Sequence, residues 1–115
     1  MSKLRDKVAG IKDIKEENLY VPEWDVTFLV RALTGAARNK ILNAAMDKNG
    51  KLDLDRFYPD LIIAACFDPE SGEQVFEPTD RDMLLSKSGS ALERIAQKAI
   101  KMSGLDDIEA KEKNS

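Results

Sequence analysis

The stretch Leu61-Ile62-Ile63-Ala64-Ala65-Cys66-Phe67 is the longest apolar run in the chain. It ends a segment, roughly Asp55 to Cys66, that we expect to be helical. A helix that is apolar all round has to be enclosed by other elements, so this run should form the centre of the core, with Ile62 and Ile63 buried. Pro59 is tolerated only in the first turn of a helix, which predicts that the regular helix begins near it.

Two strand-like runs precede this segment, over residues 19–21 and 26–32. Both alternate in polarity and are rich in β-branched and aromatic residues, and Pro22-Glu23-Trp24-Asp25 suits a hairpin connection between them. Phe28, in the second run, should be buried. Trp24 is the only tryptophan. We expect Trp24 to cover the apolar face of the hairpin. The alternative is that Trp24 anchors a binding partner, and it is the single residue we name as a partner-binding candidate.

Helical patterns lie on both sides of the apolar run. Thr34 suits an N-cap, and an apolar stripe follows it until Asn49-Gly50 stops the helix. A short helix should open at Pro78. The pattern Ser90-x-x-Glu93 is a capping box, which predicts a further amphipathic helix that ends at Gly104.

These elements predict an α+β fold, in which an N-terminal β-hairpin packs with a bundle of four to five helices. The turn cluster Asp68-Pro69-Glu70-Ser71-Gly72 and an extended segment at 74–76 predict a second, short hairpin-like turn near 67–76. We expect one domain over residues 17–104 and a flexible polar tail over 105–115.

Residues 1–16 form an N-terminal arm in this prediction. Leu4, Val8 and Ile11 recur at helical spacing, with basic residues between them. This pattern predicts a short helix. It is either mobile until a partner orders it, or laid on the surface of the domain.

Composition excludes several classes of function. The 115 residues include 18 Lys and Arg against 21 Asp and Glu, a net charge of −3 that argues against a general nucleic-acid binder. The chain has no histidine and one cysteine, so it lacks catalytic Ser-His-Asp and Cys-His sets, histidine metal sites and disulfides. The longest apolar run is far below the about 20 residues that span a bilayer. With no signal-peptide pattern at the start, the simplest setting is cytoplasmic.

The segment Asp47–Asp53 looks like a calcium loop. An EF-hand needs an oxygen ligand, a glycine and a glutamate where this chain has Lys51, Leu52 and Tyr58. We therefore favour a helix-ending turn with Gly50 at positive φ.

No other chemical site emerges. Cys66 lies in an apolar run, so a buried and inert thiol is expected. Asp53 and Asp55 either flank a site or, as such pairs more often do, cap a helix. We predict no catalytic residue, no cofactor and no metal site, and the chain is not expected to be an enzyme. A small nucleotide- or metal-dependent enzyme is disfavoured, because the calcium loop fails and Gly50-Lys51 has Ala45 and Leu52 where a phosphate loop needs Gly and Ser or Thr.

Several local strings resemble the tail assembly chaperones of long-tailed bacteriophages and prophages. They are Val21–Val26, Arg31–Gly35, Asp68–Gly72 followed by Val75-Phe76, and Asp80–Ile100. Together they span most of residues 20–104. They correspond to a turn, a helix cap, a second turn and a helix pair, so the resemblance is one of fold.

The resemblance implies a protein that coats the long, helix-rich tape measure protein until tail-tube subunits polymerise, and that is absent from the finished virion. It implies the tape measure protein as partner, with the tail-tube protein as a second candidate, and self-association into a ring or spiral, with no nucleic-acid or membrane partner. No contact residue can be carried over. The alternative is a structural head–tail connector or tail-completion subunit.

The resemblance also implies a possible second product. Such chaperones are often made in two lengths by a −1 ribosomal frameshift, and Glu112-Lys113-Asn114 can be encoded as GAA-AAA-AAC, which contains a slippery run. We hypothesise a minor, longer form that begins with the same residues. A polar tail of ordinary Glu, Lys and Asn codons is the alternative.

Overall fold

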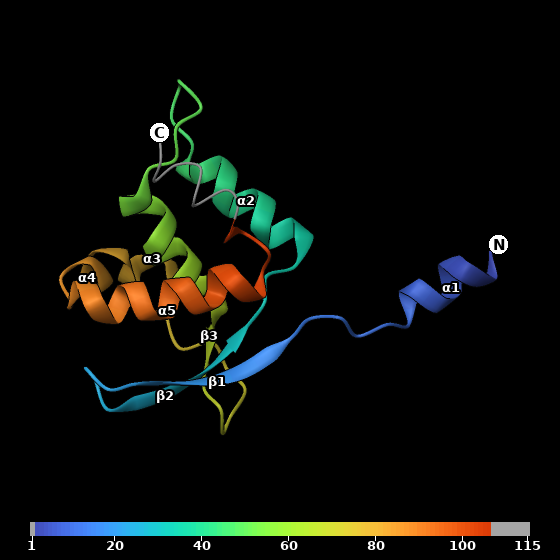
Figure 1. Cartoon of the computed structure of the whole chain (residues 1–115), viewed down its shortest axis with the longest axis horizontal. Coiled ribbons are helices and arrows are strands. Elements are labelled where there is room, and N and C mark those ends of the chain that lie inside the picture. The colour runs from blue at the N-terminus through green and yellow to red at the C-terminus, as the bar shows by residue number, and fades with distance from the viewer. Residues whose placement is uncertain (1, 107–115) are drawn as a thin grey trace.

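The computed structural model describes residues 2–106. Its elements are α1 (Lys3–Ala9), β1 (Glu16–Val21), β2 (Val26–Arg31), α2 (Gly35–Ala45), α3 (Leu54–Ala65), β3 (Cys66–Phe67), the 3-10 helix η1 (Pro78–Asp80), α4 (Arg81–Leu85) and α5 (Gly89–Met102). The strands form one antiparallel sheet in the order β1-β2-β3. Figure 1 shows this sheet along one side of the helices, with α5 beside the hairpin. The predicted α+β class is confirmed.

The hairpin forms as its polarity pattern predicts. Val21 pairs with Val26 at the turn and Leu19 with Phe28 further along. The Trp24 N–H donates to the Val21 carbonyl at 3.1 Å, which closes the turn. Because residues two apart in a strand share a face, Val26 and Phe28 point to the same side of β2.

Helix α3 is the centre of the core, as expected. Ile62 is 0% exposed, and both Ile63 and Phe28 are also buried. The expected start of the helix near Pro59 is wrong: α3 begins at Leu54 and holds Pro59 in its interior. Asp53 caps the helix one turn earlier, accepting from the Asp55 N–H at 3.0 Å. An interior proline loses its own amide donor and its ring crowds the carbonyl four residues earlier; here the Pro59 ring is fully buried in the core.

The apolar run does not end as a helix. Its last two residues, Cys66 and Phe67, form β3 and pair with Val30 and Leu29 of β2. Phe67 also bridges to Gln74, so the predicted hairpin-like turn near 67–76 is confirmed.

The turn after α2 ends the helix as predicted. Asp47 Oδ1 accepts the N–H groups of Asn49 and Lys51 at 2.8 and 2.9 Å, and Gly50 has φ +76°. The expected helix-ending turn with Gly50 at positive φ is confirmed. The Thr34 cap is also confirmed, with the Ala37 N–H at 3.2 Å.

The predicted capping box of α5 is wrong. The N-cap is Ser88, which accepts from the Ala91 N–H at 3.4 Å, and Ser90 lies in the first turn. The Ser90 hydroxyl instead donates to Glu23 of the hairpin turn at 2.9 Å. That partner is remote in sequence, so local chemistry alone could not reveal it.

The packed part of the chain extends past Gly104. This glycine has φ +69° and ends α5 as expected. The turn directs Leu105 back onto the core, where it is 1% exposed and its N–H donates to the Ile100 carbonyl at 2.9 Å. The prediction that the flexible tail begins at Leu105 is therefore wrong. Residues 107–115, including the proposed slippery codons, lie outside the described residues.

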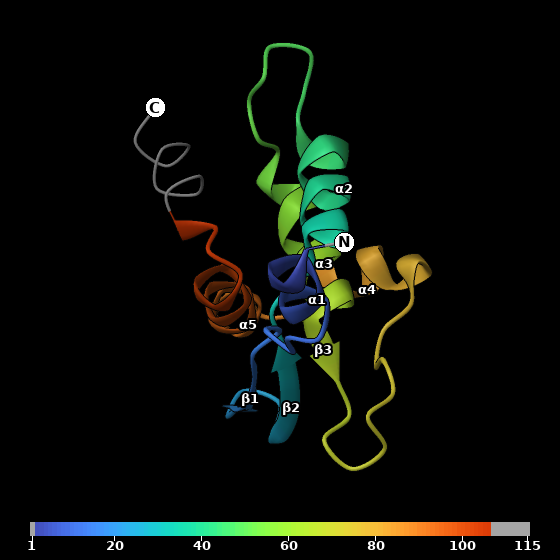
Figure 2. The same ribbon diagram turned by 90° about the vertical axis from the view of Figure 1, so that its right-hand side faces the viewer.

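Helix α1 stands apart from the rest of the molecule. No residue of α1 is buried. Figure 1 shows the helix at the end of an extended segment, well clear of the body; in Figure 2 the arm points toward the viewer, so α1 is drawn in front of the body. The arm therefore does not lie on the surface of its own domain. Within residues 2–106, no helix is both long and apolar enough to cross a membrane.

Candidate functional site: an apolar groove beside the hairpin

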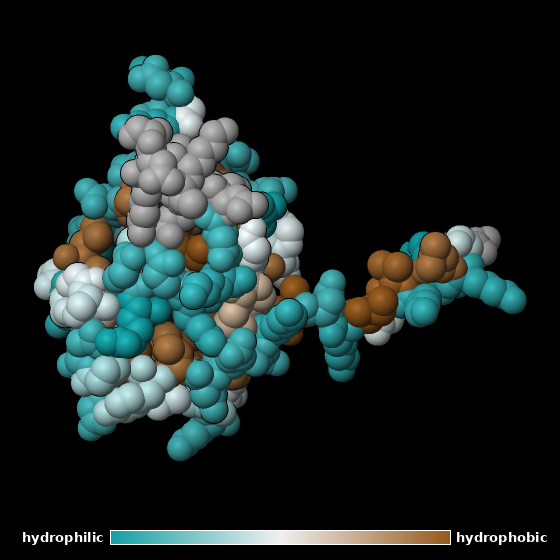
Figure 3. Space-filling view, in the orientation of Figure 1, coloured by the Kyte–Doolittle hydropathy of each residue, from teal (hydrophilic) through white to brown (hydrophobic). Residues whose placement is uncertain are grey.

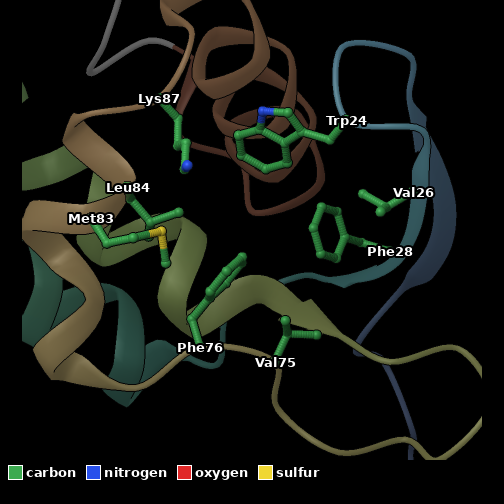
Figure 4. Close-up of a pocket in the computed structure, with 8 residues that line it drawn as sticks. All are labelled: Trp24, Val26, Phe28, Val75, Phe76, Met83, Leu84 and Lys87. Atoms are coloured by element: carbon green, nitrogen blue, oxygen red, sulfur yellow. The ribbon is translucent and has the colours of Figure 1, made fainter.

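An open apolar groove of about 460 Å³ lies where the hairpin, the segment after the second turn and α4 converge. We call it the hairpin groove. Its lining residues are Trp24, Val26, Phe28, Val75, Phe76, Met83, Leu84 and Lys87. Figure 4 shows these side chains facing a common space from three separate segments of the chain.

Aromatic side chains build one wall of the groove. The Trp24 ring meets the Phe28 ring edge-on, with centroids 6.2 Å apart and an interplanar angle of 88°. Phe76 packs against the same Phe28 ring at 5.8 Å. Such edge-on and tilted pairs are favourable geometries for aromatic rings and give the wall a defined shape. Trp24 thus covers the apolar face of the hairpin as predicted, while part of it remains exposed to the groove.

The rim of the groove carries apolar side chains that face solvent. Val26 is 38% exposed, Val75 42% and Met83 40%. Isolated exposed apolar residues are common, but a continuous apolar hollow with such a rim is typical of an interaction surface. Methionine adds adaptability, because its unbranched side chain can fit different partners.

Charged side chains of both signs lie in or beside the groove. Lys87 is the single charged residue among those that line it. A neighbouring hollow shares Val26, Phe28 and Val75 with the groove and is also lined by Asp68 and Glu70. The groove itself is therefore lined by apolar side chains and one ammonium group, and two carboxylates line the hollow beside it.

Glu23 fastens the hairpin turn that carries Trp24. The Arg94 guanidinium donates to the Glu23 carboxylate at 3.1 Å, and the Ser90 hydroxyl donates to it at 2.9 Å. The Arg94 hydrogen bond, followed by the backbone N–H of Glu23 and the Ser90 hydroxyl, lowers the pKa of this carboxyl. These contacts tie the turn to α5 and fix the position of the aromatic wall.

The other residues considered from sequence have structural roles. Cys66 is fully buried, and burial raises the pKa of its thiol to about 12, so it is protonated and unreactive at neutral pH. Asp53 caps α3 by accepting from the Asp55 N–H, so this pair has the helix-capping role. Among residues 2–106, no group of three or more acidic or thiol side chains could hold a metal ion.

The sequence predicts Trp24 over the hairpin face and Phe28 in the core, but it gives no signal for the opposite side of the groove. Val75 was placed in an extended return and Met83 in a short helix, without a shared role. Nothing local links these positions to the hairpin, because the groove exists only once the fold brings the second turn and α4 alongside β2.

Comparison with known proteins agrees with the fold. No curated protein matches the chain. Among solved structures, the bacteriophage HK97 tail assembly chaperone is similar, with a TM-score of 0.57 at 18% identity over 88% of this chain and 98% of that one. At this identity the likeness shows a shared fold. A family model described as phage tail assembly chaperone matches residues 5–114. Since that match covers nearly the whole sequence, the chain belongs to the family of phage tail assembly chaperones.

Proposed function

We propose that this protein binds the tape measure protein of its phage in the host cytoplasm and keeps it soluble until the tail tube polymerises, after which it is not retained in the virion. The observation that carries the proposal is the hairpin groove, an open apolar hollow with an exposed apolar rim. A helix-rich client presents apolar stripes that would otherwise aggregate. The groove offers such a stripe a complementary surface.

The binding mode we infer is a helix laid in a groove. An amphipathic helix inserts apolar side chains spaced three or four residues apart, and specificity follows from the shape of the pocket. Here the rings of Trp24 and Phe76 form rigid walls, while Met83 supplies an adaptable contact. A chaperone that must accept many different segments of one long client benefits from that combination.

One groove of this size supports only modest affinity. Association costs roughly 4 to 15 kcal/mol because the two partners lose translational and rotational freedom. This cost offsets most of the free energy gained from burying a few apolar side chains. Many copies along one client nevertheless hold it firmly through multivalency. Each copy can still leave singly as the tube advances. Self-association of the chaperone into a ring or spiral would supply the required array.

The family match favours this function over the structural alternative of a head–tail connector or tail-completion subunit. The two are separable by the composition of purified virions, which should lack the chaperone and would contain a connector. Gene order is a second criterion. A chaperone gene should lie directly upstream of a very long tape measure gene.

The proposal is tested by titrating the protein with a helical peptide from that tape measure protein. Trp24 is the only tryptophan and lies in the groove, so its emission should shift on binding to a tryptophan-free peptide. A Val75→Ser/Met83→Ser variant should bind at least tenfold more weakly. Met46→Ser is the matched control: Met46 is 38% exposed, like Met83, but lies outside the groove. Unchanged affinity in the groove variant would contradict the proposal.

A further inference from the structure

Helix α1 presents an apolar stripe that its own domain leaves uncovered. Leu4 is 69% exposed, Val8 61% and Ile11 52%. Their spacing of four and three residues places them on one side of the helix and its final turn, where the Ile11 N–H donates to the Val8 carbonyl at 3.1 Å. Figure 3 shows hydrophobic side chains along the isolated helix. A helix of seven residues has little stability alone in water, so it requires a surface on which to pack.

The arm begins at the end of the hairpin that is remote from the groove. Glu16, the first residue of β1, pairs with Arg31, whereas the groove lies by the turn at Pro22–Asp25. A strand of six residues separates the two ends by roughly 20 Å at about 3.3 Å per residue. The linker between α1 and β1 then leads outward, away from the body (Figure 1). This geometry holds α1 away from the groove of its own copy.

The arm and the groove are complementary in charge as well as in polarity. Between residues 2 and 15 the chain has five basic and two acidic side chains: Lys3, Arg5, Lys7, Lys12 and Lys15, against Asp6 and Asp13. Asp68 and Glu70 line the neighbouring hollow, which shares Val26, Phe28 and Val75 with the groove, whereas Lys87 lines the groove itself. An amphipathic helix with an apolar stripe and mainly basic sides suits an apolar hollow that has two carboxylates beside it, provided that its acidic residues face Lys87.

We propose that α1 of one copy docks in the hairpin groove of a second copy. The contact joins two different surfaces, so each copy offers a free arm at one end and a free groove at the other. Such a head-to-tail contact propagates into a ring if its rotation closes and into a spiral if it does not. The arm would occupy the groove assigned above to the client, so this inference rests on the proposed function only for its consequence: a client helix displaces the arm from the groove it enters, while arms in the remaining grooves keep the copies linked.

The docking is tested by disulfide crosslinking in the absence of any client. A Val8→Cys copy mixed with a Met83→Cys copy under mild oxidation should give a covalent heterodimer. The native Cys66 is buried and does not compete. Val8→Cys mixed with Met46→Cys is the matched control, because both methionines have nearly equal exposure and only Met83 lines the groove. Equal crosslinking of the two mixtures, or none with Met83→Cys, would overturn the proposal.

A complementation experiment tests the direction of assembly. An arm variant, Leu4→Ser/Val8→Ser, and a groove variant, Val75→Ser/Met83→Ser, should each sediment as monomers, because each lacks one half of the contact. Mixed, they should form a one-to-one heterodimer and nothing larger. All four residues are at least 40% exposed, so both variants should retain the wild-type helical circular dichroism. Wild-type oligomers from either variant alone would overturn the proposal.

The outcome also separates this inference from the proposed function. An intrachain disulfide in a Val8→Cys/Met83→Cys double variant, formed in dilute monomer, would show that the arm folds onto its own groove and would overturn docking between copies. If the arm variant remains oligomeric yet the groove variant loses the client peptide, the inference fails and the proposed function stands. If copies crosslink through the groove but no client peptide binds, the inference stands and the proposed function fails.

Discussion

Truncation of Ile62 to alanine should cost roughly 2–5 kcal/mol of unfolding free energy. Ile62 is 0% exposed in α3, the helix that packs against α2, α4 and α5. The substitution removes three carbon atoms, and at about 0.8 kcal/mol for each buried carbon the transfer term alone is about 2 kcal/mol. The cavity adds to this, because neighbours on three helices cannot all relax toward it. For a domain of this size such a loss lowers the Tm by roughly 10 °C or more.

Urea denaturation followed by circular dichroism measures this loss. The control is Ile11→Ala, which deletes the same three carbons from a side chain that is 52% exposed on the arm. The control should change the unfolding free energy by less than about 0.5 kcal/mol. A loss below about 0.5 kcal/mol for Ile62→Ala, or equal losses at the two sites, would refute the placement of α3 at the centre of the core.

Three further predictions address the hairpin clasp, the buried thiol and the end of the chain. Because the folded state lowers the pKa of Glu23 from 4.5, its ionised form stabilises the fold above that value, and this contribution disappears as pH falls through the lowered pKa. In urea denaturation, wild type should be more stable than Glu23→Gln at pH 7, and the difference should close below pH 4.5; a gap that persists in acid contradicts the clasp. Cys66, with its pKa raised to about 12, should resist a thiol reagent at pH 8 in the folded protein and react fully in urea; rapid reaction of the folded protein would show that the core is open there. The codons of Glu112-Lys113-Asn114 should read GAA-AAA followed by AAC or AAU, and a G in the third place of either of the first two, with no slippery run nearby, rules out frameshifting at this point.

Local chemistry was sufficient to predict the principal elements. The apolar run that contains Ile62 is too hydrophobic for any surface position, and the alternating β-branched and aromatic residues around Phe28 predict a strand. Thr34 and Gly104 mark helix ends through bonds and backbone angles that depend on immediate neighbours. Where the determinants are local, sequence and structure agree.

The wrong predictions lie where a residue that is distant in sequence determines the local structure. Ser88 and Ser90 both have the chemistry of an N-cap, and the choice between them involves Glu23, which lies 67 positions from Ser90. Leu105 follows a polar boundary in sequence, yet the Gly104 turn returns it to the core. The same limit applies to the hairpin groove. The sequence predicts that Trp24 covers the hairpin face, but the Met83 side depends on tertiary packing that no spacing pattern records.

The central claim is tested most directly by co-expressing the chain with the tape measure protein of the same phage and measuring how much of that protein is soluble. We predict that the tape measure protein is insoluble alone and soluble with the wild-type chaperone or with Met46→Ser. It should remain insoluble with Val75→Ser/Met83→Ser, provided that this variant is itself folded and expressed. A tape measure protein that stays insoluble beside the wild-type chain, or that dissolves equally well beside the groove variant, would contradict the account.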